Sequence, residues 1–162
     1  MKIFNLKAFT FFLIATLALF TSCKKDNDVE PGDGTSGKFF SCTLDGAVYE
    51  CASLFSYGVK NETDAAILVY GVQNDLDGTV YIQMPETTEV GTHVFSEEIY
   101  AYVSIGGKAY STRFGTPEGI VTLTKKSGTH LEGTFKFTAY DSDDFETTMS
   151  VENGTFNVDF RE

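Results

Sequence analysis

The sequence predicts an all-β domain, because side chains from Lys38 onward alternate with the period of β-strands and turn residues separate the alternating segments. In segment 134–140, Phe135, Phe137 and Ala139 point to one side and the residues between them to the other. No segment shows the spacing and caps of an amphipathic helix. We therefore expect an antiparallel β-sandwich over residues 38–162, with a lipocalin-like β-barrel as the alternative.

The expected strands follow one another as hairpins. Asp45-Gly46 separates the first two expected strands, and segment 66–72 is apolar throughout, as a strand covered on both faces would be. Val80, Ile82 and Met84 alternate with polar residues, and segment 99–105 places Tyr100 and Tyr102 opposite its aliphatic side chains. The C-terminal part is expected to form a meander of three long strands, 119–126, 130–140 and 145–160.

Residues 1–22 have the order of a secretory signal peptide. Lys2 and Lys7 are its basic residues, segment 8–20 is its apolar core, and Thr21-Ser22 supplies small residues before the cleavage point. A helix of that apolar length reaches about 20 Å at 1.5 Å per residue, which is short of a roughly 30 Å hydrocarbon core. Cleavage is therefore favoured over a retained transmembrane helix.

Cys23 follows directly, and Phe20-Thr21-Ser22-Cys23 resembles the lipobox of bacterial lipoproteins, with Phe20 where leucine is usual. The resemblance implies that Cys23 is acylated, with palmitate among the chains, and becomes the new N-terminus. Two acyl chains suffice for stable membrane anchoring. Segment 23–37, with its Gly, Asp and Ser, is expected to be a flexible acidic tether.

These features predict a protein of the cell envelope that the lipid holds to the outer membrane. The acidic run after Cys23 resembles the surface-export signals of Bacteroidota lipoproteins, and a plain solvated linker is the alternative interpretation. The net charge of −11 makes nucleic acid an unfavourable partner, because an acidic domain repels phosphate.

Four segments carry a resemblance to a domain family of unknown function found in Bacteroidota lipoproteins. They are FFSCTLDG at 39–46, GIVTLT at 119–124, GTFKFTA at 133–139 and NGTF at 153–156. The resemblance covers residues 38–160 and implies a secreted β-domain without an assigned activity.

Cys42 and Cys51 remain once Cys23 is assigned to the lipid, and an even pair in an exported protein suggests a disulfide. The register of the first hairpin decides whether the bond can form. A turn at Asp45-Gly46 places Cys42 opposite Tyr49, whereas a turn at Gly46-Ala47 places Cys42 opposite Cys51. We predict the second register and the disulfide.

No motif nominates catalytic residues, a zinc site or a cofactor. Asp141, Asp143 and Asp144 are weak candidates for Ca²⁺, since aspartate also populates turns without a metal.

Tyr100, Tyr102 and Tyr110 are weak candidates for a surface that stacks on sugar rings; cross-strand packing is the simpler explanation. We expect a non-enzymatic domain that binds or scaffolds, with a glycan or another envelope protein as its partner. A glycan-binding module, a small envelope hydrolase and a carrier of an apolar ligand are the alternatives. An exposed tyrosine patch would favour the glycan, clustered acids in a cleft the hydrolase, and an aromatic-lined interior cavity the carrier.

Overall fold

The computed structural model describes residues 37–51, 53–73 and 78–161. Every described residue lies in one compact unit of the chain, Thr35–Glu162. The predicted signal peptide, Cys23 and the tether up to residue 36 lie outside the described residues. In the part that is described, no helix has the length and apolarity needed to cross a membrane.

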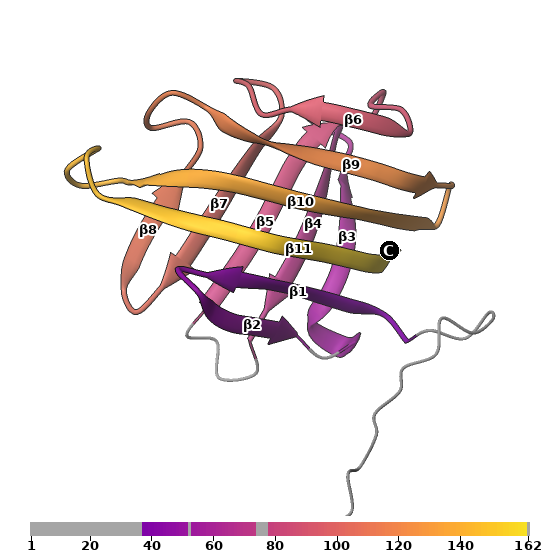
Figure 1. Ribbon diagram of the computed structural model, residues 1–162. Coiled ribbons are helices and arrows are strands. Elements are labelled where there is room, and N and C mark those ends of the chain that lie inside the picture. Colours follow the sequence, from indigo (N-terminus) through magenta and orange to yellow (C-terminus); the bar gives the residue numbers. More distant parts are fainter. Residues whose placement is uncertain (1–36, 52, 74–77, 162) are drawn as a thin grey trace, which may run out of the picture. The chain divides into compact units, whose positions relative to one another are not determined.

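Within the described part of the chain, eleven strands form one continuous sheet that folds into two layers. The front layer of Figure 1 has the order β2 (Ala47–Cys51), β1 (Phe39–Leu44), β11 (Thr148–Arg161), β10 (His130–Asp141), β9 (Glu118–Lys126), β6 (Gly91–Val94). The back layer has the order β3 (Ser56–Asn61), β4 (Ala66–Val72), β5 (Gly78–Pro85), β7 (Tyr100–Ile105), β8 (Lys108–Ser111). A short 3-10 helix, η1 (Ser53–Phe55), leads from β2 to β3.

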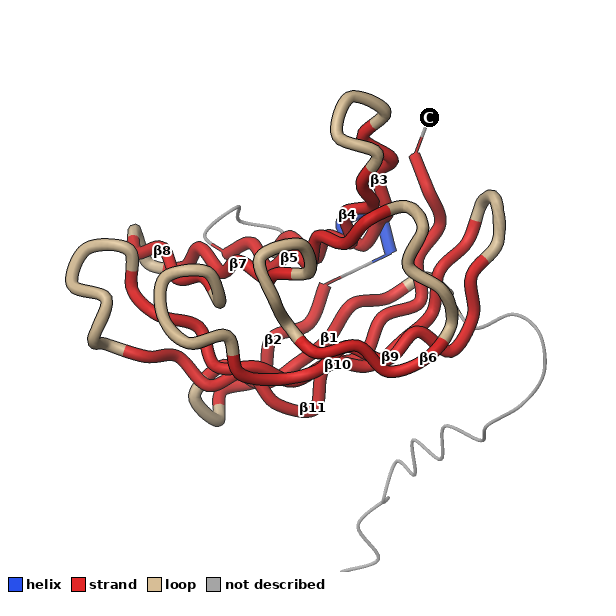
Figure 2. The backbone as a smooth tube through the Cα atoms, turned by 90° about the horizontal axis from the view of Figure 1, so that it is seen from above, coloured by secondary structure: helices blue, strands red, loops and turns tan. Residues whose placement is uncertain are grey.

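The strands of the two layers cross at a large angle, and the layers stay joined at two corners (Figures 1 and 2). At one corner the end of β11 pairs in parallel with β3, through Phe160 beside Gly58. At the other, the end of β10 pairs with β8, through Tyr140 beside Ser111. The predicted all-β class is therefore confirmed, as a two-layer arrangement that is antiparallel except at the β3–β11 contact.

The core lies between the layers and is rich in aromatic rings. The rings of Phe40 and Phe135 have centroids 5.1 Å apart, and Phe156 stacks on Phe135 at 6.2 Å. At Gly71 of β4 a Cβ atom would lie 2.3 Å from the Phe40 ring, so the layers approach too closely there for any side chain. The buried hydroxyl of Tyr49 donates to carbonyl oxygens of the back layer, at 2.8 and 3.0 Å. This interior is filled by side chains packed at close range.

The back layer corrects one prediction. Segment 66–72 was expected to be covered on both faces, but only its inward side chains, such as Ile67 and Val69, are buried in the core. The outward side chains Leu68, Tyr70 and Val72 are half-buried on an open face. They shield one another and their cross-strand neighbours, which explains an apolar composition without a third layer.

The first hairpin corrects the predicted disulfide. Asp45 and Gly46 both have positive φ, of 47° and 83°, which is the requirement of a type I′ turn. Cys42 therefore lies opposite Tyr49, while Cys51 lies opposite Phe40, and both cysteines are free, buried thiols. The register with Cys42 opposite Cys51 does not form, because it needs the turn one residue later.

We predict that both thiols resist alkylation in the folded domain and react when it unfolds. Burial raises the pKa of Cys42 to about 12, so the reactive thiolate is scarce at neutral pH. The chain carrying Cys23→Ser should be treated with iodoacetamide without a reducing agent, and its intact mass measured. We expect no label in native buffer and two labels in urea. No label under both conditions would mean that a disulfide links the two residues.

Candidate functional site

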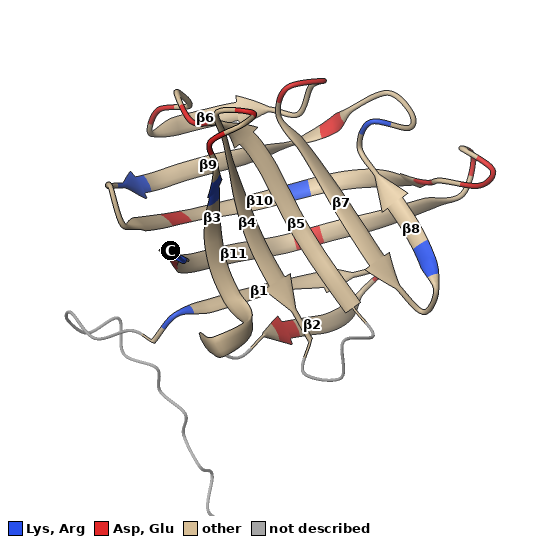
Figure 3. Cartoon of the chain, turned by 180° about the vertical axis from the view of Figure 1, so that it is seen from behind, with Lys and Arg blue, Asp and Glu red and all other residues tan. Residues whose placement is uncertain are grey.

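The outer face of the back layer carries no charged side chain among its described outward residues. The face consists of three cross-strand rows: Tyr57, Tyr70, Tyr81, Tyr102; Val59, Leu68, Gln83, Tyr100; and Val72, Thr79, Ser104. Figure 3 shows this layer from outside, with few charged positions along its strands. Lys60 of β3 lines a cleft at the end of the strand. An uncharged sheet face is unusual for a chain with a net charge of −11.

Four tyrosines, one from each of β3, β4, β5 and β7, stand in register and form what we call the tyrosine row. The ring centroids of Tyr57 and Tyr70 are 5.2 Å apart, those of Tyr70 and Tyr81 are 5.3 Å apart, and those of Tyr81 and Tyr102 are again 5.2 Å apart. Within the first pair and within the last pair, the two ring planes are inclined to each other by 22°. Tyr100 meets Tyr81 edge to face at 6.4 Å.

The rings of the row are offset from one another, which leaves part of each ring uncovered. Parallel rings in contact are separated by roughly 3.5–4 Å, so a centroid distance of 5.2 Å between nearly parallel rings corresponds to a lateral shift. All four rings are half-buried, in agreement with this offset. Burial raises the pKa of Tyr81 to about 12, so its hydroxyl stays protonated and can both donate and accept hydrogen bonds.

Both arginines of the chain lie against tyrosines of this face, one at each side. The Arg161 guanidinium is 3.6 Å from the centre of the Tyr57 ring, and that of Arg113 is 4.7 Å from the centre of the Tyr100 ring. Such cation–π contacts hold planar groups over the ring faces. Tyr100 is further held by its hydroxyl, which donates to Gln83 at 2.7 Å. The aromatic surface is thus bordered and kept in place by side chains from β11 and the β8–β9 loop.

The outer face of the front layer has the opposite chemistry. Polar contacts run across this face from the residue before β1 to β9. Lys38 lies 2.6 Å from Asp159 of β11, and Lys125 of β9 lies 3.0 Å from Glu132 of β10. The His130 ring bridges the two carboxylates, at 2.7 Å from Asp159 and 2.8 Å from Glu132. These ion pairs lower the pKa of both carboxyls, through Lys38 first at Asp159 and through Lys125 first at Glu132. The two outer faces are therefore suited to different surroundings, one ionic and one aromatic and neutral.

Two of the three tyrosines proposed from the sequence belong to the neutral face. Tyr100 and Tyr102 lie on it side by side. Tyr110 does not, and its inclusion was wrong: it pairs with Val103, points into the core and is 6% exposed. The two-residue turn at Gly106-Gly107 fixes the register between β7 and β8. In this register Tyr110 lies opposite Val103, and both side chains point into the core.

Sequence reasoning missed Tyr57, Tyr70 and Tyr81 as members of one surface. Each occupies an outward position between inward residues of its strand, so alternation could have placed each of them on an outer face. Their alignment depends on the register between strands, for which the sequence carries no comparable signal.

Two aspartates at the β10–β11 turn have their carboxylates bound by neighbouring protein groups. Asp141 is buried, receives Lys108 at 3.1 Å and accepts the backbone N–H of Asp143 at 2.8 Å. Asp144 accepts three hydrogen bonds, from the Thr147 hydroxyl at 2.6 Å and from the N–H groups of Glu146 and Thr147 at 2.8 Å. Within residues 37–51, 53–73 and 78–161, no three His, Cys, Asp or Glu side chains are grouped to hold a metal.

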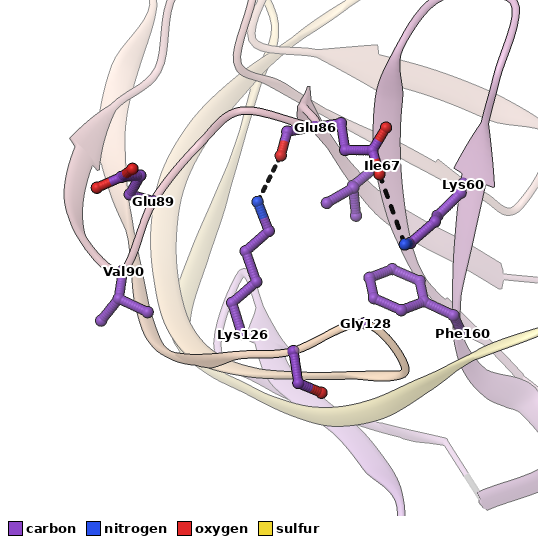
Figure 4. Close-up of a pocket in the computed structure, with 9 residues that line it drawn as sticks. Lys60, Ile67, Glu86, Glu89, Val90, Lys126, Gly128 and Phe160 are labelled. Atoms are coloured by element: carbon purple, nitrogen blue, oxygen red, sulfur yellow. Dashed lines mark hydrogen bonds and ion pairs between the residues drawn. The ribbon is translucent and has the colours of Figure 1, made fainter.

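A cleft of about 540 Å³ opens at the end of the sandwich, beside the β3–β4 hairpin and the β9–β10 hairpin (Figure 4). Lys126 reaches across it and donates to the carbonyl oxygens of Glu86 and Thr88, the latter at 2.8 Å. Lys60 lies 3.5 Å from the Glu86 carboxylate. The cleft is separate from the tyrosine row, since none of the row's residues lines it.

We predict an acid-dependent loss of stability that comes from Asp144. Its hydrogen bonds, led by the Thr147 hydroxyl, lower its pKa to about 2 from an ordinary 3.8. A carboxyl with a lowered folded-state pKa stabilises the fold above its ordinary pKa, and that stabilisation is lost as the pH falls from about 4 through about 2. Urea unfolding across this range should show a smaller decline for Asp144→Asn than for the parent chain. Asp143→Asn is the matched control and should decline like the parent; equal curves for all three would contradict the prediction.

Comparison with known proteins leaves the function of this arrangement open. No curated protein and no solved structure matches the chain. A family model does match, over residues 38–158, which span the sheet from the residue before β1 to within three residues of the end of β11. The chain therefore belongs to the family described as domain of unknown function DUF6252.

Proposed function

We propose that this protein is a non-enzymatic, envelope-anchored lipoprotein whose β-domain binds neutral glycans on the outer face of β3, β4, β5 and β7. The observation that carries the proposal is the tyrosine row on a face whose described outward strand residues are uncharged, with one arginine at each side. Tyrosine has an apolar ring body and a polar hydroxyl tip, and a sugar ring likewise combines an apolar C–H face with hydroxyl groups. A row of partly uncovered rings suits such a ligand.

Charge argues for a neutral glycan over an acidic one. The chain has 23 acidic against 12 basic residues, so a polyanion is repelled as it approaches the domain. The neutral face avoids this cost and also avoids the desolvation of buried charge on binding. Ser104, Thr79 and Gln83 add donors and acceptors beside the rings, which a hydroxyl-rich polymer can use.

The alternatives have less support in the structure. A carrier of an apolar ligand needs a cavity between the layers, where side chains such as Phe40, Phe135 and Phe156 are packed together. A hydrolase needs acids placed for chemistry in a cleft. Asp141 and Asp144, at the β10–β11 turn, are bound to nearby backbone groups and to Lys108. Of the two glutamates that line the cleft of Figure 4, Glu86 pairs with Lys60 and the Glu89 carboxylate is directed away. A protein partner remains an outcome of the binding test.

Anchoring through Cys23 completes the proposal. The Phe20-Thr21-Ser22-Cys23 segment resembles a lipobox, and the tether after it separates the lipid from a domain that begins at Lys38. In this proposal the protein is a Bacteroidota lipoprotein of the outer membrane, and the acidic tether directs it to the cell surface. A surface location would place the tyrosine row where extracellular polysaccharide is encountered.

We predict that removing one central ring of the row weakens glycan binding. In native affinity electrophoresis against xylan, mannan, starch and polygalacturonate, at least one neutral polysaccharide should retard the Cys23→Ser chain. Tyr81→Ala should weaken that binding by about tenfold, equivalent to about 1.4 kcal/mol, since Tyr81 contacts three other tyrosines. Tyr81→Phe, which keeps the ring, should retain most of it.

Thr134→Ala on the outer face of the front layer is the control for this comparison and should bind like the parent. Retardation by none of the neutral polymers would contradict the proposal, and so would equal retardation of parent and Tyr81→Ala. If an envelope protein binds the parent chain but not Tyr81→Ala, the ligand of this face is a protein and not a glycan.

We predict that Cys23→Ser releases the protein from the membrane fraction, because the acyl chains supply the anchor. The parent chain, expressed in a bacterium that processes lipoproteins, should sediment with membranes and carry a mass increment of acyl groups on its N-terminal cysteine. Cys42→Ala is the matched control and should stay in the membrane fraction. Membrane association of Cys23→Ser would contradict lipid anchoring.

A further inference from the structure

The cleft at the end of the sandwich combines apolar walls with two ammonium groups. Ile67 of β4 and Phe160 of β11 lie at its floor, and Val90 of the β5–β6 loop lies at its rim (Figure 4). Lys60 and Lys126 reach in from opposite sides, from β3 and β9 (Figure 4). The volume of about 540 Å³ falls within the range of small-molecule sites, which are mostly apolar with a few polar groups.

Lys126 brings a positive charge that no carboxylate among the described residues neutralises within 4.0 Å. Its ammonium donates to two carbonyl oxygens, those of Glu86 and Thr88, which hold it in place without cancelling its charge. An ammonium has three donors, so one remains for a ligand. The same two bonds tie the β9–β10 hairpin to the β5–β6 loop and so form one wall of the cleft.

Lys60 has only a loose ion pair. Its ammonium lies 3.5 Å from the Glu86 carboxylate, beyond the 2.7–2.9 Å of a strong charge-assisted hydrogen bond, and 5.1 Å from the centre of the Phe160 ring. Glu89 also lines the cleft, but its carboxylate is directed away from the space between the two lysines (Figure 4). Inside the cleft, two ammonium groups therefore face one carboxylate, in a chain that is otherwise strongly acidic.

We propose that this cleft binds a small organic carboxylate with an apolar body. The carboxylate accepts from Lys60 and from the remaining donor of Lys126, and the body packs on the Phe160 ring and on the exposed side chain of Val90. A ligand with a single negative charge is compatible with the acidic domain, because repulsion by exposed charges is screened within roughly 8–10 Å at physiological ionic strength. This site is independent of the proposed glycan surface.

The test uses octanoate as the probe and octanamide as its neutral counterpart of the same shape. Calorimetric titration of the full chain carrying Cys23→Ser should find octanoate bound at least about tenfold more tightly than octanamide, since hydrogen bonds between charged groups contribute more than those to a neutral amide. Lys60→Gln and Lys126→Gln should each weaken octanoate binding by about tenfold or more. Phe160→Ala should weaken octanoate and octanamide alike, through the loss of apolar contact.

Two controls make the result specific to the cleft. Lys136→Gln removes an equal charge from the outer face of β10 and should leave octanoate binding unchanged. Amide shift mapping should place the probe at the lining residues of β3, β9 and the β5–β6 loop. Equal binding of octanoate and octanamide, or an equal loss in Lys136→Gln and Lys60→Gln, would overturn the proposal. Because Lys126→Gln also removes a link between two loops, Lys60→Gln decides the case if that variant fails to fold.

Discussion

Because β10 and β11 run beyond the layer to which they belong, their ends pair with strands of the other layer. β10 has 12 residues and β11 has 14, against four to nine for the remaining strands. The end of β11 continues along β3, and the end of β10 continues along β8. These two corners close the sheet on itself, satisfy backbone groups that would otherwise be exposed at the edges of the back layer, and fix how the layers cross.

The same hairpin bends where its register shifts. Pairing is interrupted between Phe135 and Phe137 on β10, opposite the stretch of β11 in which Asn153 has a φ of 53°. Bulges increase local twist and bend a strand, so they let a long hairpin curve around a core instead of extending past it. Because the end of β11 pairs with β3, Arg161 lies beside that strand and reaches the Tyr57 ring.

Closing the sheet in this way leaves two outer faces that are not equivalent. The front face is held by cross-strand ion pairs that remain partly exposed and by hydroxyl pairs such as Ser41 with Thr155. The back face is held by ring contacts, whose apolar area is only partly hidden. No third layer of the described structure covers this aromatic surface. Its exposure on an otherwise acidic domain is the reason for proposing that it binds the ligand. The cleft lies at one end of the two layers, where the β3–β4 hairpin, the β9–β10 hairpin and the β5–β6 loop meet.

Alternation along each strand was sufficient to predict the all-β class, the three long C-terminal strands and the shared face of Tyr100 and Tyr102. These features depend on neighbours in sequence, because successive side chains of a strand point to opposite sides whatever the strand pairs with. The tertiary structure alone decided that Cys42 meets Tyr49, that Tyr110 faces the core, and that tyrosines from four strands form one row. Any strand can hydrogen-bond to any other through the backbone, and a shift of one residue reverses every side chain, so strand order and register are set by the packing of the whole domain.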